Sequence, residues 1–145
     1  MASEYKPNLG VIAVTAAATL SDDAYAGRTI NLNSTTGRTI TLPAATGSGA
    51  AYTIFVGATV SSGSHVVAAA GTDVIQGVVA IATDIAGVSV PTASDTDTIT
   101  LNGTTTGGLK GWRVICDDIA ADVWAVNVMS EASGTEATPF SATVS

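Results

Sequence analysis

The segment from Gly37 to Trp124 is built from short runs of Thr, Val and Ile that are broken by glycine-containing turns. Within the runs, apolar and polar residues alternate, as in the Thr-Ile-Thr-Leu run at 39–42. Alternation with a period of two places one set of side chains on each face of a β-strand, and β-branched residues favour that conformation. A chain with this pattern is expected to fold into β-sheets.

The alternating runs predict ten strands, most of them separated by turns at intervals of about 8–12 residues, which is typical of sandwiches and small barrels. The predicted strands cover residues 11–19, 28–32, 38–42, 51–57, 65–70, 73–81, 87–90, 97–101, 111–116 and 122–129. We therefore expect an all-β chain with a single small β-sandwich or barrel-like domain and extended N- and C-terminal arms. The expected boundaries are an N-terminal arm at 1–10, a β-domain at 11–129 and a C-terminal tail at 130–145.

Two local structures are predicted in more detail. Residues 28–32 and 38–42 both read Arg-Thr-Ile-x-Leu, and the linker 33–37 ends in glycine. Because glycine supplies the positive φ that tight turns need, the two segments are expected to form a hairpin. A short helical turn is predicted at 21–27, with Ser21 as N-cap and Gly27 as the stop.

The surface of this chain must be poor in charge. Hydrophobic residues make up 46% of the 145 residues, whereas charged residues make up 12%, about half of the usual ~25%. Such a chain covers its exterior with Thr, Ser, Ala and Gly or buries it against other chains, so we expect assembly. The net charge of −7 and five scattered basic residues argue against nucleic acid as a partner.

No membrane partner is expected either. The apolar stretch at 66–90 is interrupted by Asp73, Gln76, Asp84 and several glycines, so it lacks the ~20 apolar residues of a transmembrane helix. The first seven residues lack the basic and apolar regions of a signal peptide. We therefore expect a soluble protein that is made in the cytoplasm.

The inventory of reactive side chains predicts that the chain is not an enzyme and has no cofactor. His65 and Cys116 are the only residues of their types, so a zinc site is not expected and we assign both to structural roles. The neighbouring acids Asp22 and Asp23, Asp95 and Asp97, and Asp117, Asp118 and Asp122 are interpreted as solvated turn residues. A hydrolase that uses two of these carboxylates is the less favoured alternative, because such sites lie in clefts lined with aromatic residues.

The turn and strand signatures resemble those of small β-rich virion proteins of tailed bacteriophages, in particular head decoration (cement) proteins. The resemblance covers most of residues 11–129. It is carried by Thr39-Ile40-Thr41-Leu42-Pro43, Thr46-Gly47-Ser48-Gly49, Tyr52-Thr53-Ile54, Asp73-Val74-Ile75-Gln76-Gly77, Thr98-Ile99-Thr100-Leu101-Asn102-Gly103, Gly107-Gly108, Gly111 and Trp124.

The resemblance implies a homotrimer that binds the major capsid protein on the outer capsid surface of a virion and stabilises the shell. The N-terminal arm is the first candidate for capsid contact, through Tyr5, Lys6, Pro7 and Leu9, and the 130–145 tail is the second. Trimer or core packing is expected of Phe55, Trp112 and Trp124. The alternative is a tail-fibre or receptor-binding β-module that contacts the host surface through loops such as Thr104–Lys110.

Overall fold

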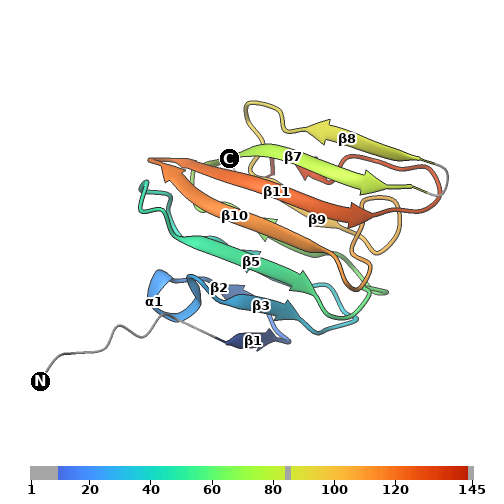
Figure 1. Cartoon of the computed structure of the whole chain (residues 1–145), viewed down its shortest axis with the longest axis horizontal. Helices are drawn as coiled ribbons and strands as arrows, with labels where there is room; N and C mark the ends of the chain where they lie inside the picture. Colours follow the sequence, from blue (N-terminus) through green and yellow to red (C-terminus); the bar gives the residue numbers. More distant parts are fainter. Residues whose placement is uncertain (1–9, 84–85, 144–145) are drawn as a thin grey trace, which may run out of the picture.

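Two β-sheets pack face to face in the computed structural model, which describes residues 10–83 and 86–143 (Figure 1). The larger sheet has the order β1 (Val11–Val14), β3 (Thr29–Leu32), β5 (Ala51–Val56), β10 (Arg113–Ala120), β11 (Val123–Glu131), β7 (Val74–Ala82) and β8 (Gly87–Pro91). The smaller sheet has the order β12 (Phe140–Ser141), β9 (Thr98–Leu101), β6 (His65–Ala68), β4 (Thr39–Thr41) and β2 (Ala18–Thr19). The predicted all-β sandwich is confirmed.

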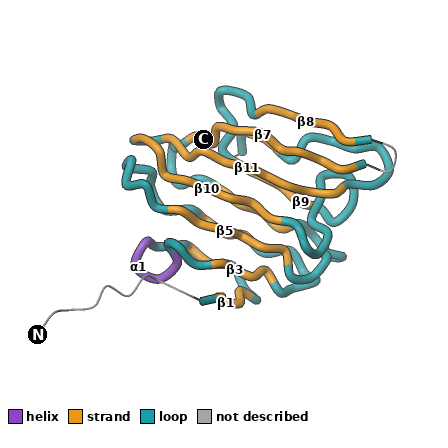
Figure 2. Tube along the Cα trace, viewed as in Figure 1, coloured by secondary structure: helices purple, strands orange, loops and turns teal. Residues whose placement is uncertain are grey.

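Helical structure in the described residues is confined to α1 (Asp22–Tyr25), which lies beside the N-terminal edge of the sandwich (Figure 2). Ser21 takes the predicted N-cap position in an extended conformation, although its side chain makes no capping hydrogen bond. No helix in the described part of the chain has the length and apolarity that a bilayer crossing requires.

The first six strands wind between the two sheets as three stacked coils. Strands β1, β3 and β5 lie parallel to one another in the larger sheet, and β2, β4 and β6 lie parallel in the smaller one. Each odd-numbered strand is therefore followed by an arch that crosses to the opposite sheet. This arrangement places residues of successive coils above one another in register, as in solenoid proteins.

The hairpin predicted for residues 28–42 is wrong. β3 and β4 do not pair, because the linker between them carries the chain from the larger sheet to the smaller one. The reason for Gly37 also differs from the prediction: a Cβ atom there would overlap the backbone of Ser64 in the next arch. The two arches are joined by hydrogen bonds, including one from the Gly37 N–H to the Ser62 carbonyl oxygen at 2.7 Å. Close stacking of the arches, and not a tight turn, therefore requires the glycine.

The β10–β11 hairpin separates β7 from the three coils. β10 pairs antiparallel with β5 on one side, and β11 pairs parallel with β7 on the other. β7 consequently runs in the same direction as β1, β3 and β5, but two strands, β10 and β11, lie between it and β5. Residues that are distant in the sequence are thus adjacent in the larger sheet (Figure 1).

The core is a layer of β-branched and aromatic side chains between the two sheets. One inward row of the larger sheet crosses every strand in register and consists of Ile12, Ile30, Ile54, Val114, Val128, Val79 and Val90. Ile40, Val67 and Ile99 face this layer from the smaller sheet and are fully or almost fully buried. Burial of such side chains stabilises each by about 1.5–3 kcal/mol, so the layer accounts for most of the cohesion of the sandwich.

The described part of the C-terminal tail belongs to the sandwich. β11 continues to Glu131, and β12 pairs antiparallel with β9 through Phe140 and Ser141. The Phe140 side chain is 9% exposed, and the Thr143 N–H donates to the Asp97 carboxylate at 2.8 Å. Through Thr143 the tail therefore packs on its own domain, unlike the extended arm that we expected.

Candidate interaction surface

The outer face of the larger sheet carries few charges: Arg113 and Asp117 of β10 and Glu131 of β11 point outward by alternation. Two outward rows cross all seven strands in register: Ala13, Asn31, Phe55, Arg113, Met129, Ala80 and Ser89 form the first, and Val11, Thr29, Thr53, Ile115, Asn127, Val78 and Pro91 form the second. Arg113 is the only charged residue in these rows. Exposed faces of soluble proteins are usually richer in charge, so this face is suited to contact with another surface.

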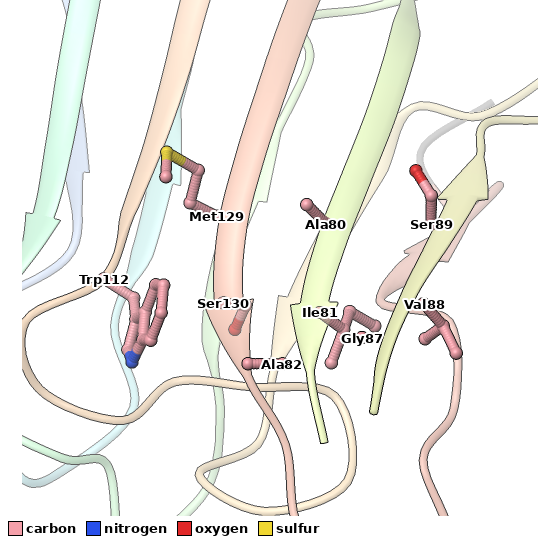
Figure 3. A pocket seen from close by; sticks show the side chains of 9 residues that line it. All are labelled: Ala80, Ile81, Ala82, Gly87, Val88, Ser89, Trp112, Met129 and Ser130. Atoms are coloured by element: carbon pink, nitrogen blue, oxygen red, sulfur yellow. The ribbon is translucent and has the colours of Figure 1, made fainter. Parts of the chain in front are cut away.

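A hollow of about 400 Å³ opens on this face near the end of β11 (Figure 3). Trp112 and Met129 form one wall, and β7 and β8 form the other. The lining consists of Ala80, Ile81, Ala82, Gly87, Val88, Ser89, Trp112, Met129 and Ser130. Since none of these residues is charged, the hollow is suited to an apolar side chain of a partner.

A second hollow of about 390 Å³ lies on the other side of the same aromatic residue. It is lined by Gly111, Trp112, Arg113, Ile115 and Met129, so Trp112 and Met129 border both hollows. The pair thus forms a ridge between two depressions. We call the ridge and both hollows the Trp112 patch.

Two polar contacts hold the aromatic residues of this face in place. The Trp112 indole N–H donates to a Glu131 carboxylate oxygen at 3.3 Å. The Arg113 guanidinium lies 5.7 Å from the centre of the Phe55 ring, within the range of a cation–π contact. Arg113 and Phe55 are also directly opposite each other in the β10–β5 register. These contacts hold the Trp112 and Phe55 rings against the outer face of the sheet.

The three residues assigned to trimer or core packing are in different environments. Trp124 is fully buried, and its ring contacts Tyr52 edge-on with centroids 5.7 Å apart. Phe55 and Trp112 are half-buried on the outer face. Only Trp124 belongs to the core, and the other two remain candidates for contact with a partner. The predicted capsid-binding residues Tyr5, Lys6, Pro7 and Leu9 lie outside the described residues.

The two residues with potentially reactive side chains are buried. Cys116 is a free thiol on β10 with no exposed surface, and burial followed by the charge of Asp117 raises its pKa to about 12. His65 is also fully buried, and its Nδ1 accepts the Arg38 N–H at 3.2 Å. Burial lowers the His65 pKa, so its ring is neutral at physiological pH. Both predicted structural roles agree with these positions.

The acids do not all lie in solvent as predicted. Asp73, Asp97 and Asp118 are 2–5% exposed and accept hydrogen bonds, so the interpretation of Asp97 and Asp118 as solvated turn residues is wrong. Within the described residues, no three His, Cys, Asp or Glu side chains are grouped closely enough to hold a metal ion. Asp73 and Asp118 instead accept hydrogen bonds from backbone N–H groups of the loop between β4 and β5, and Asp97 accepts one from the N–H of Thr143, which follows β12.

Asp118 fastens the loop between β4 and β5. Its carboxylate accepts the backbone N–H groups of Thr46, Gly47 and Ser48 at 2.7–3.1 Å. The Ser48 hydroxyl donates to the same carboxylate at 2.7 Å. Burial alone would raise the Asp118 pKa, but these hydrogen bonds outweigh it and hold the pKa below its ordinary range.

The Asp118→Asn variant should lose about 2–4 kcal/mol of the free energy of unfolding at pH 7, because one acceptor oxygen becomes an NH₂ group that faces N–H donors. Since the folded-state pKa lies below the unfolded value of about 3.9, the carboxylate contributes fully above that pH and loses its contribution as the pH falls further. Urea unfolding from pH 7 to pH 2 should therefore show a smaller acid loss in the variant. Asp117→Asn is the control, with an expected change of less than about 0.5 kcal/mol; equal acid loss in wild type and Asp118→Asn would contradict the prediction.

In comparisons with known proteins, no protein-family model, curated protein or solved structure matches the chain. Its function is therefore inferred from its own geometry. Sequence reasoning identified Phe55 and Trp112 but missed Met129, which is 48% exposed in the alternating β11. The available signal was the spacing: Met129 is an odd-numbered residue, whereas the buried Trp124, Val126 and Val128 are even-numbered.

Proposed function

We propose that this chain is a structural protein of a phage virion that binds the outer surface of the icosahedral capsid as a trimer and stabilises the shell. The observation that carries the proposal is the low-charge outer face of the larger sheet with the Trp112 patch. A decoration protein acts by surface contact, and such a face offers apolar area at little desolvation cost. The resemblance of the turn and strand signatures to cement proteins supports the same assignment.

The rigid support of the patch also favours this role. The ridge of the patch lies on or next to β10 and β11, whose backbone groups are hydrogen-bonded to a neighbouring strand on both sides. A surface that is ordered before binding loses little conformational entropy on contact. In a trimer, three such surfaces act together, so modest individual contacts add up to tight binding.

The copy number of this chain in purified virions, relative to the major capsid protein, tests the proposal. Comparable amounts are expected for a decoration protein. A few copies per particle would instead favour the tail-fibre or receptor-binding alternative, and complete absence from virions would overturn both assignments.

Binding to undecorated capsids tests the surface itself. Met129→Lys places a charge on the ridge of the Trp112 patch and should lower capsid occupancy at least tenfold. Thr39→Lys adds the same charge to an exposed position of the smaller sheet and is the matched control. Equal occupancy for the two variants would exclude the Trp112 patch as the capsid contact.

A further inference from the structure

Within residues 10–83 and 86–143, both edges of the larger sheet are unpaired and uncharged. In the described chain, β1 pairs only with β3, and β8 pairs only with β7. Their sequences, Val-Ile-Ala-Val and Gly-Val-Ser-Val-Pro, contain no charged residue. Edge strands of soluble proteins are normally protected from pairing by charges, proline, bulges or a covering segment. Among the residues that the structure describes, the only such feature at these two edges is Pro91, at the last position of β8.

The smaller sheet has edges of a different kind. Its edge strands, β2 and β12, have two residues each, whereas β1 has four and β8 has five. Shortness is itself a protection, because two residues offer few hydrogen bonds to an incoming strand. Only β1 and β8 are therefore long enough to pair with a strand of another molecule through several hydrogen bonds.

The two long edges are complementary in direction. β5 pairs antiparallel with β10, β10 antiparallel with β11, β11 parallel with β7, and β7 antiparallel with β8. β8 therefore runs opposite to β5, and also opposite to β1, which is parallel to β5 through β3. If the sheet of one copy continued into that of the next, β1 would meet β8 in the antiparallel orientation, which pairs strands slightly more stably than the parallel one.

The hydrogen bonds inside the sheet show which edge groups are free. Gly10 accepts a hydrogen bond from Thr29 in β3, so by alternation the N–H of Ala13 points to the open edge. At the other edge, Thr83 donates to Ala86, and the same alternation along β8 leaves the N–H of Ser89 pointing outward. Each edge thus has at least one exposed residue, Ala13 on β1 and Ser89 on β8, whose backbone N–H is free to donate a hydrogen bond to an added strand.

Exposed apolar side chains accompany these donors. Among the described residues, four large hydrophobic side chains are exposed: Val11, Val88, Ile119 and Met129. Val11 lies on β1 and is 67% exposed, and Val88 lies on β8 and is 45% exposed. Pairing of the two edges would remove apolar surface from water on both copies.

We propose that copies of this chain associate head to tail, with β1 of one copy pairing antiparallel with β8 of the next. The contact is heterologous, so it repeats from one copy to the next and forms a closed ring when the rotation between successive copies closes, or an open filament when it does not. The number of copies in the ring, three, rests on the proposed function. The net charge of −7 makes copies of the chain repel one another. Because β1 and β8 carry no charge, contact through these edges adds little to that repulsion.

Proline variants test the pairing by light-scattering measurement of mass after gel filtration. Ala13→Pro and Ser89→Pro each remove an outward N–H without removing a hydrogen bond inside the sheet, and proline is tolerated at such edge positions. We expect a trimer for the wild type and monomers for each proline variant at the same micromolar concentration. Ala13→Ser and Ser89→Ala keep the amide groups and should remain trimers.

Mixing the two proline variants gives the sharpest result. Ala13→Pro retains an intact β8 edge and Ser89→Pro an intact β1 edge, so an equimolar mixture should form a heterodimer of twice the monomer mass. Should a proline variant lose its circular dichroism signature, Val11→Lys and Val88→Lys replace the pair, because both positions are exposed. Thr39→Lys is then the control of equal charge.

Three outcomes would overturn the inference. Trimers that persist in Ala13→Pro would exclude the β1 edge, trimers that persist in Ser89→Pro would exclude the β8 edge, and either result would indicate contact through a sheet face. A monomeric wild type would exclude the pairing altogether. Virion copy number is measured separately, so a monomer found at capsid stoichiometry would remove the edge contact and leave capsid binding in place.

Discussion

Replacing Gly103 by alanine should lower the free energy of unfolding by about 4 kcal/mol or more, equivalent to a fall in Tm of about 10 °C or more. Gly103 has a φ of +84°, in the left-handed region that disfavours other residues. An added Cβ would also overlap the carbonyl oxygen of Val60. Because that oxygen belongs to the backbone of a neighbouring loop, the clash cannot be relieved by a side-chain rotation.

Gly49→Ala is the matched control for Gly103→Ala. Gly49 also has a positive φ, +77°, but no atom lies within 4 Å of the position that a Cβ would take. This variant should lose only the conformational cost of about 1–2 kcal/mol. Thermal unfolding followed by circular dichroism measures both variants, and similar Tm values would show that the Val60 contact is unimportant.

The Trp124→Ala variant should lose about 3–5 kcal/mol. Trp124 has no exposed surface and lies near the start of β11, between Asp118 of β10 on one side and Ile75 of β7 on the other. Its removal leaves a cavity against Tyr52 that the strands on both sides cannot collapse to fill. Urea unfolding monitored by far-ultraviolet circular dichroism gives the change directly.

The other tryptophan of the chain provides the control. Trp112→Ala removes the same side chain from a half-buried position on the outer face and should cost about 1 kcal/mol or less. The two variants should separate further in capsid binding, where loss is expected from Trp112→Ala. Equal destabilisation by the two substitutions would contradict the assignment of Trp124 to the core and Trp112 to the surface.

The strands themselves could be predicted from the sequence, but their partners could not. Alternation identified nearly all of the strands, including β5 and β7, because a period of two is a local property of the chain. The predicted pairing of β3 with β4 was wrong, because a strand has the same alternation whether the preceding linker leads back into the same sheet or across to the other one. Gly37 fits a tight turn equally well in sequence, and only the position of Ser64 in the next arch shows its true role.

The surface was partly predictable for a similar reason. Phe55 and Trp112 were identified by residue type. When the outer face of a sheet also meets a partner, both faces of a strand carry apolar residues, so the sequence does not show which apolar residue points outward. Whether Met129 or Val128 points outward depends on the register of β11 with β7 and β10. The burial of Asp118 likewise depends on a loop 70 residues earlier in the chain, so no local pattern indicates it.

The position of the β10–β11 hairpin has a consequence for synthesis of the chain. Strands β1 to β6 can stack as soon as they leave the ribosome, because each coil needs only the one before it. The larger sheet cannot be completed at that stage, because β5 and β7 are joined only through β10 and β11, which residues 113–131 form. A nascent chain that stops before Arg113 therefore carries two additional unpaired strand edges, one on β5 and one on β7, until residues 113–131 fill the space between them.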